Sequence, residues 1–229
     1  MSAFISSEAA QMYIDLTEAA KAGNVAAFQR IERMLKDEFD ISWNDNEHGT
    51  TYLIWASFHG HMNFVSYLVE KGAIVDKKNK YGSTALSYAL QGKHVDVARL
   101  LLERGADPNI KPYDTKNATF LLFGNVQPYD TTNHDFPLCF AAQENQPEAC
   151  ELLLSFGANL DQKTANGWTS LDVAIQLKHT KGIKVLQTAI DKKKEEKRKE
   201  EKRKEIIANI AKAAKARNTE VPSICSASN

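Results

Sequence analysis

The sequence predicts an all-α fold in which similar helical units are stacked in a row, followed by a long charged helix. Segments that begin at Ala56, Ala89 and Ala141 align without gaps, and each ends in Gly-Ala. The first two Gly-Ala pairs lie 33 residues apart, at Gly72 and Gly105. Repeats of this length indicate a solenoid, because one helical unit cannot bury its own apolar face and a neighbour must cover it. Toward the C-terminus, glutamate and lysine follow one another at helical spacing with almost no apolar residues.

The first unit is expected near residues 9–45 and consists of two helices. The first helix begins near Ser6 or Ser7, with Glu8 in its first turn, where a carboxylate interacts favourably with the free amides. The second helix is capped by Asn24, whose side chain can accept a hydrogen bond from an amide of the first turn. This pair therefore forms the N-terminal end of the stack.

Each later unit is predicted to have an inner and an outer helix, and each residue type at the recurring positions has a physical reason. Threonines precede the inner helices, where a hydroxyl can cap the first turn. Alanines lie where two helices approach closely, leucines form a buried stripe, and glycines end the outer helices in a left-handed conformation. The positions are Thr51, Thr84 and Thr169; Ala56, Ala89, Ala141 and Ala174; Leu68, Leu101, Leu102, Leu153 and Leu154; and Gly72, Gly105 and Gly157.

A recurring motif opens these units, as "GTTYLIWA" at Gly49, "GSTALSYA" at Gly82, "GWTSLDVA" at Gly167 and a degraded "DFPLCFA" at Asp135. It resembles the Gly-x-Thr-Pro-Leu-His-x-Ala pattern of ankyrin repeats, although the proline is kept only at Pro137 and the histidine nowhere. The resemblance implies an ankyrin-repeat solenoid of about five helix-turn-helix units with short β-hairpin loops. It covers residues 13–190, in an array of residues 1–190 whose units lie near 9–45, 46–78, 79–111, 112–163 and 164–190.

An insertion of 19 residues lengthens the fourth unit, since 52 residues separate Gly105 from Gly157. It contains the apolar stretch "TFLLFGN" between flanks rich in turn-forming residues. We expect that these apolar side chains do not all stay solvated, because monomers usually avoid an exposed apolar patch. Two interpretations remain open: the 112–130 loop folds back over the array, or it contacts a partner.

The C-terminal extension, residues 191–217, is predicted to continue the last outer helix from about Thr180 towards Arg217. Pairs such as Glu195 with Lys199 have helical spacing but add only ~0.2 to 0.5 kcal/mol each, so continuation from the array must supply the nucleation. The extension is either a solvated charged helix or a surface that docks on a partner helix through Ile206 and Ile210. The last residues, 218–229, are expected to be disordered.

Composition favours a soluble, cytoplasmic protein. Lys plus Arg and Asp plus Glu both total 29, so no net field attracts nucleic acid or a membrane. The N-terminus has no apolar signal region, and no window is apolar enough for a membrane span. Three cysteines, Cys139, Cys150 and Cys225, suit a reducing compartment in which thiols serve as small core residues. We expect a monomer without cofactors or bound metal.

No motif in the sequence predicts catalysis. His59 and His61 could form part of a metal site, but no nearby carboxylate or thiol completes it. His134 and Asp135 have no accompanying nucleophile, and Cys139 is predicted to be buried. An enzyme with its site in the insertion is therefore kept only as an alternative.

The resemblance to ankyrin repeats implies that a protein partner is bound on the concave face, by residues at the loop tips and on the inner helices. Phe58, Tyr81 and Trp168 are candidate anchors, because the fold needs no aromatic side chain at their positions. Trp55 and Tyr88, together with Phe140 at the same inner-helix position, are expected in the core. The predicted contacts are Glu47, His48, Thr50, Phe58, His59, Lys80, Tyr81, Ser83, Gln91, Gln143, Glu144, Ala165, Asn166, Trp168 and Gln176, with Phe120, Phe123 and Tyr129 from the loop.

The functional prediction is a non-catalytic adaptor that binds a protein through this face, the loop and the C-terminal helix. A second hypothesis is deployment in a host cytosol, because the glutamate-rich block and short, small-residue end resemble translocation signals of type IV secreted bacterial effectors. Asn109, in "LLERGADPN", resembles asparagines that are hydroxylated in ankyrin repeats; alternatively, its side chain rigidifies the hairpin.

Overall fold

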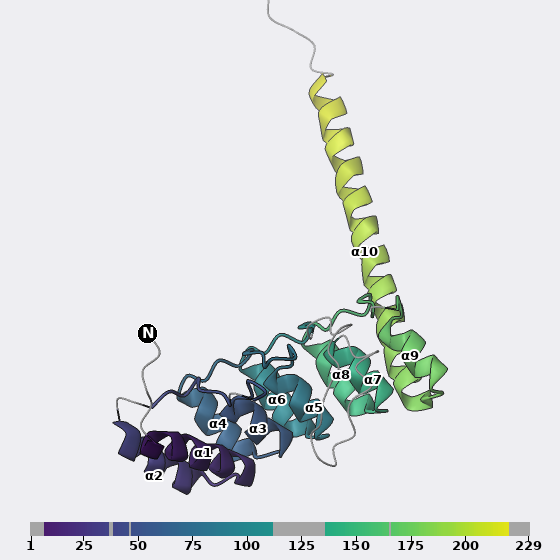
Figure 1. Ribbon diagram of the computed structural model, residues 1–229. Helices are drawn as coiled ribbons and strands as arrows, with labels where there is room; N and C mark the ends of the chain where they lie inside the picture. Colours follow the sequence, from purple (N-terminus) through teal and green to yellow (C-terminus); the bar gives the residue numbers. More distant parts are fainter. Residues whose placement is uncertain (1–6, 37–38, 46, 112–135, 165, 220–229) are drawn as a thin grey trace, which may run out of the picture. The chain divides into compact units, whose positions relative to one another are not determined.

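The protein is described by a computed structural model that covers residues 7–36, 39–45, 47–111, 136–164 and 166–219 (Figure 1). The described residues contain ten α-helices and no strand, which confirms the predicted all-α class. Two compact units are present, Met1–Leu186 and Gln187–Asn229. The predicted limits of the individual repeats stay predictions.

The helices of the first unit form two layers (Figure 1). Successive members of the inner layer contact one another, as do successive members of the outer layer. Helices α1, α3, α5 and α7 each contact the outer helix that follows. The inner layer comprises α1 (Ser7–Ala22), α3 (Tyr52–Phe58), α5 (Ala85–Gln91), α7 (Pro137–Gln143) and α9 (Ser170–Gln176). The outer layer comprises α2 (Val25–Leu35), α4 (Met62–Glu70), α6 (Val95–Glu103) and α8 (Pro147–Ser155).

The side chains expected between the layers are buried there. The four inner-helix alanines have no exposed surface, and neither do Leu68, Leu101 and Leu153 on the outer helices. Leu154 is only partly buried, although it packs against the same core. The repeated small and large apolar positions therefore make one continuous core through the array.

Helix caps follow the prediction at two of three threonines. The Thr51 hydroxyl accepts a hydrogen bond from the Ile54 amide at 3.2 Å, and Thr169 forms a reciprocal capping box with Asp172. The prediction for Thr84 is wrong, because its hydroxyl makes no cap hydrogen bond and lies 3.5 Å from that of Ser87. The loops before these helices are closed by backbone hydrogen bonds across each turn, such as that from the Asn79 amide to the Ser83 carbonyl at 3.0 Å. Among the described residues, one such loop also forms an isolated antiparallel bridge, between residues 44 and 51.

Side chains at the start of the outer helices join neighbouring repeats. His61 Nε2 donates a hydrogen bond to the Lys21 carbonyl at the end of the preceding inner helix (2.8 Å). His179 Nδ1 donates to the Ala142 carbonyl in the same way (3.0 Å), and the Gln146 amide donates to another such carbonyl (2.9 Å). Carbonyls in the last turn of a helix lack a partner within the helix, so these bonds to the next repeat help to fix each repeat against its neighbour. The Leu90 carbonyl, which Gln146 contacts, also accepts from the Lys93 amide at 3.0 Å.

Glycines at helix ends meet two different requirements. Gly72 ends α4 with φ of 91°, as predicted, and a Cβ atom there would meet no neighbour. Gly92 ends α5 with φ of −69°, but a Cβ atom there would overlap the Phe58 carbonyl oxygen and the His94 ring. Close approach of α5 to the end of α3 thus requires the absence of a side chain at Gly92.

Gly92→Ala is expected to lower the free energy of unfolding by roughly 1 to 3 kcal/mol, because α5 must move away from α3. Without the overlap, the same change would be stabilising through the unfolded chain. Urea unfolding of the variant measures the effect. Gly72→Ala is the control and should show only the left-handed strain of about 1 kcal/mol. A Gly92→Ala variant as stable as the wild type would contradict the proposed close contact.

The last helix, α10 (Thr180–Thr219), is continuous, as predicted. Leu186 is fully buried in the first unit, whereas every residue from Asp191 to Lys212 is exposed. The predicted ion pair of Glu195 with Lys199 is present at 2.7 Å, and Glu200 pairs with Lys204 at the same helical spacing at 3.4 Å. Residues 220–229 lie outside the described residues, so the prediction for the tail is not addressed.

Candidate protein-interaction surface

The inner layer carries an aromatic side chain where the other repeats are polar. Each inner helix has a core alanine, and the residue two positions later is Lys21 in α1, Gln91 in α5, Gln143 in α7 and Gln176 in α9. In α3 this residue is Phe58, which is partly exposed. Since four repeats fold with a polar side chain at this position, the ring of Phe58 is not required for the fold.

Phe58 lies in a group of rings that we call the aromatic patch, defined as Trp55, Phe58, His59 and Tyr88. The centroid of the Phe58 ring lies 5.1 Å from that of His59 and 6.0 Å from that of Tyr88, both edge to face. The Trp55 ring stacks on His59 at 6.2 Å. The patch thus joins α3 to α5 on one side of the inner layer.

The patch is bordered by a cation and a second imidazole. Lys21 Nζ lies 4.6 Å above the Trp55 ring and 2.8 Å from a carboxylate oxygen of Glu18. The His61 ring stacks on His59 at 5.9 Å. Burial lowers the pKa of His59 below its ordinary value of 6.5, and the neighbouring His61, Lys21 and His94 lower it further. His59 is therefore neutral at pH 7, and the patch presents rings rather than charge.

This lowered pKa predicts that acid destabilises the array. As pH falls below 6.5, His59 becomes protonated in the unfolded chain but stays neutral in the folded protein, where its pKa is lower. The free energy of unfolding therefore decreases as pH falls from 6.5 towards the lowered pKa. The unfolding midpoint should therefore fall less between pH ~7.5 and pH ~5.5 in His59→Gln than in the wild type. Urea unfolding at both pH values measures this, and equal pH dependence of the two proteins would contradict it.

The turns before the inner helices are built around side-chain acceptors. Asp45 accepts hydrogen bonds from the backbone amides of His48 and Thr50. In the next repeat Asn79 accepts from two amides of its own turn, and Thr164 accepts from the Trp168 amide. These internal bonds give each loop tip a defined conformation.

The loop tip of the second repeat, at Glu47 and His48, is hydrogen-bonded to the loop tip of the third repeat, at Lys80 and Tyr81. The Lys80 ammonium donates to the Glu47 carbonyl at 3.1 Å, and the Tyr81 hydroxyl lies 2.7 Å from His48 Nδ1. Glu47 and Lys80 are exposed and Tyr81 is partly exposed. The prediction that His48 and Thr50 contact a partner does not agree with their burial, because Thr50 has 2% of its surface exposed and His48 9%. Both hold the turn instead.

The other predicted contacts are spread over separate repeats. Trp168 is exposed over 41% of its surface. Asn166 and Gln176 are also exposed, whereas Ser83, Gln91, Gln143 and Glu144 are partly exposed. Ala165, Phe120, Phe123, Tyr129, His134, Asp135 and the rest of the 112–130 loop lie outside the described residues. As contacts, the accessible residues stay predictions.

Asn109 links the loop that follows α6 to the loop that follows α8. Its side-chain oxygen accepts from the Asn159 amide at 2.8 Å, and its side-chain nitrogen donates to the Gly157 carbonyl at 3.2 Å. Both bonds are consistent with the alternative prediction that the Asn109 side chain makes the hairpin rigid. Modification of Asn109 stays a prediction.

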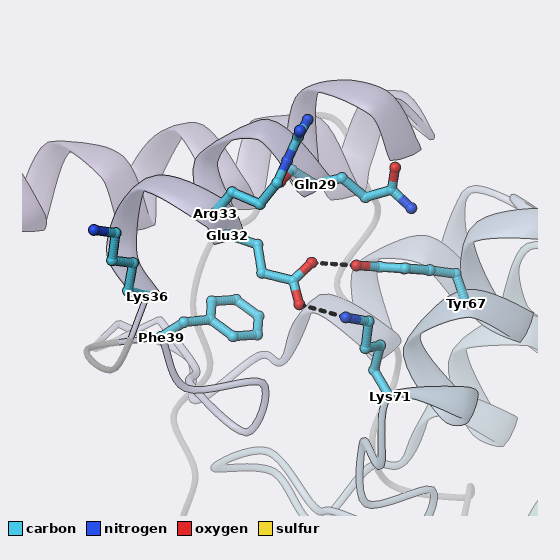
Figure 2. Close-up of a pocket in the computed structure, with 7 residues that line it drawn as sticks. All are labelled: Gln29, Glu32, Arg33, Lys36, Phe39, Tyr67 and Lys71. Carbon is cyan, nitrogen blue, oxygen red and sulfur yellow. Dashed lines mark hydrogen bonds and ion pairs between the residues drawn. The ribbon is translucent and has the colours of Figure 1, made fainter.

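The outer layer has a shallow hollow between α2 and α4 (Figure 2). Figure 2 shows the Glu32 carboxylate between Tyr67 and Lys71. It accepts a hydrogen bond from the Tyr67 hydroxyl and pairs with the Lys71 ammonium at 2.8 Å. Burial and this hydrogen bond raise the pKa of Tyr67 above its ordinary value. Because the partners of Glu32 come from the next repeat, the contact acts as a link within the stack.

The described residues include possible metal ligands and two thiols. Among them, no group of three or more histidine, cysteine or acidic side chains could hold a metal ion. Cys139 and Cys150 are buried, as predicted. Burial raises the pKa of Cys150 to about 12, so this thiol is not a nucleophile at neutral pH.

The sequence does not predict that Trp55 and Tyr88 form part of a surface patch. Trp55 and Tyr88 were predicted to be core residues with Phe140, and all three pack against the core. They are nevertheless only partly buried, so part of each ring reaches the surface. Side chains of the preceding repeat contact two of these rings, Lys21 at Trp55 and Phe58 at Tyr88. No local pattern signals this, because the uncovered side depends on how neighbouring repeats stack.

Comparison with protein families matches the family described as ankyrin repeats (3 copies), over residues 16–112 and 113–196. No curated protein matches the chain. The family match covers most of the chain, including both layers of helices and the start of the charged extension.

Proposed function

Because the chain belongs to the ankyrin-repeat family, whose repeats serve as protein–protein interaction modules, we propose that it holds a protein partner against the aromatic patch. The exposed loop tips at Glu47, Lys80 and Tyr81 extend this contact along the second and third repeats. The partner places an apolar side chain against Phe58 and Tyr88. The proposal is a binding role without catalysis.

The observation that carries this proposal is Phe58. It is an aromatic side chain at a position where other repeats have lysine or glutamine, and it contacts His59 and Tyr88 on a partly exposed surface. Aromatic residues surrounded by well-packed neighbours often dominate the energy of an interface. Helices α3, α5 and α7 contain no charged residue. A partner that binds there therefore removes water from no charged side chain of these helices.

A non-catalytic role is supported by the buried thiols and by the neutral character of the patch. The family is typically non-catalytic. The hypothesis of a translocated effector adaptor makes no use of the aromatic patch and stays a prediction.

Proximity labelling in cells tests the proposal with the full chain. We expect at least one specifically labelled protein whose labelling is lost in Phe58→Gln. Phe156→Gln is a matched control, since Phe156 is exposed on the outer layer and far from the patch in sequence. Labelling that is unchanged by Phe58→Gln would overturn the proposed site.

The 112–130 loop needs its own variant, because it lies outside the described residues. Replacement of these residues by a short glycine–serine linker keeps the repeats connected. If the labelled protein is lost only in this variant, the loop rather than the aromatic patch binds the partner. If it is lost in both, the loop and the patch share the interface.

A further inference from the structure

We propose that the end of α10 binds the surface of an anionic phospholipid membrane, through Ile206, Ile207 and Ile210 and the basic side chains near them. This inference concerns the second compact unit and goes beyond the partner-binding role proposed for the array. It does not depend on that role.

The first observation is an isolated apolar patch. Ile206, Ile207 and Ile210 are exposed over 58%, 66% and 64% of their surfaces. Their spacing places them on one side of the helix. All residues from Asp191 to Glu205 are charged, so no apolar neighbour on that side precedes the patch. Exposed groups of large apolar side chains mark interaction sites more often than accidental features.

The second observation is the distribution of charge. Residues 191–217 contain 12 Lys or Arg and 6 Asp or Glu, a net charge of +6. Residues 1–190 contain 17 Lys or Arg and 22 Asp or Glu, a net charge of −5. The zero net charge of the whole chain therefore hides a basic extension. After Glu205 the helix has Lys212, Lys215 and Arg217 and no acidic residue. An anionic partner is favoured, and pairing with the extension of a second copy is opposed by like charge.

A lipid surface fits these observations better than a protein groove. A stable protein interface needs ~800 Å² on each partner, more than three isoleucines can supply. Enlarging the contact along the helix would bury ion pairs such as Glu195 with Lys199, at a cost in hydration. At a membrane surface the apolar side chains enter the lipid while the charges stay hydrated among the headgroups. None of the described helices is long and apolar enough to cross a bilayer.

Vesicle co-sedimentation of the full chain tests the proposal. We expect binding to phosphatidylcholine vesicles that contain roughly 30% phosphatidylserine, weaker binding to pure phosphatidylcholine, and release by added salt. Ile206→Ser, Ile207→Ser and Ile210→Ser together should reduce the affinity at least about tenfold. The matched control replaces three exposed isoleucines of the array, Ile14, Ile74 and Ile175, by serine and should bind as the wild type does.

Three results would overturn the proposal. The first is no binding to the phosphatidylserine vesicles, and the second is equal binding by the triple variant of α10. The third is a dimer that the triple variant lacks in sedimentation velocity, since a second copy would then cover the patch. Circular dichroism checks that the variant keeps its helix. Proximity labelling of the array's partner should be unaffected, so this proposal and the proposed function can fail separately.

Discussion

Phe28→Ala is expected to lower the free energy of unfolding of the N-terminal repeats by about 3 to 5 kcal/mol. Phe28 has no exposed surface and lies on α2. Its ring contacts Tyr52 at 5.1 Å and Phe64 at 5.0 Å, both edge to face, and also contacts Phe39 and Tyr67. The substitution therefore removes one ring from a cluster that joins α2, α3 and α4, and the rigid neighbours cannot refill the cavity.

Urea unfolding followed by circular dichroism measures this loss. Phe156→Ala serves as the control, because Phe156 is 36% exposed at the end of α8 and removing its ring leaves no closed cavity. The control should cost less than about 1 kcal/mol. A similar small effect in Phe28→Ala would mean that the aromatic cluster does not hold the first two repeats together.

Hydrogen exchange should localise the effect of Phe28→Ala. In a linear array each repeat contacts only its neighbours, so a loss at one end is not shared equally by all repeats. Amide protection should therefore fall in α1 to α4 more than in α7 and α8. The Glu32 contacts with Tyr67 and Lys71 on the outer layer (Figure 2) lie in the same region and would be lost with it.

The fold could be predicted from the sequence because its determinants are local and repeated. Ala89 and Leu101 recur at equivalent positions in other units, and each has the same burial as its counterparts. The threonine caps could be predicted only in part, since a hydroxyl near the start of a helix can bond to another side chain instead of the first-turn amides. At Thr84 it lies near Ser87, whereas at Thr169 the following Asp172 completes the capping box.

The candidate site could be predicted only in part. Phe58 was identifiable because the same position is polar in other repeats, which needs only an alignment of the chain with itself. The exposed side of Trp55 and its contact with Lys21 depend on how α1 and α3 pack. The burial of Thr50 depends on the turn closed by Asp45. Contacts between repeats therefore decide which of the predicted residues reach the surface.

Phe58→Gln is expected to weaken binding of the labelled partner by about 30-fold to 1,000-fold, which corresponds to roughly 2 to 4 kcal/mol. The fold should be unaffected, since Gln91, Gln143 and Gln176 occupy the same position in other repeats. The loss has two sources: the partner's apolar group no longer contacts the Phe58 ring, and the Tyr88 ring loses its aromatic neighbour. Calorimetry with the purified partner measures the dissociation constant.

Two controls separate the site from a general effect of losing a phenylalanine. Phe156→Gln removes an exposed ring from the outer layer and should leave the dissociation constant unchanged. Tyr88→Phe keeps the ring beside Phe58 but removes the hydroxyl that accepts from the Asn79 amide at 3.0 Å, so it should weaken binding much less than Phe58→Gln. If Phe58→Gln binds as tightly as the wild type, the partner does not use the aromatic patch, however exposed its rings are.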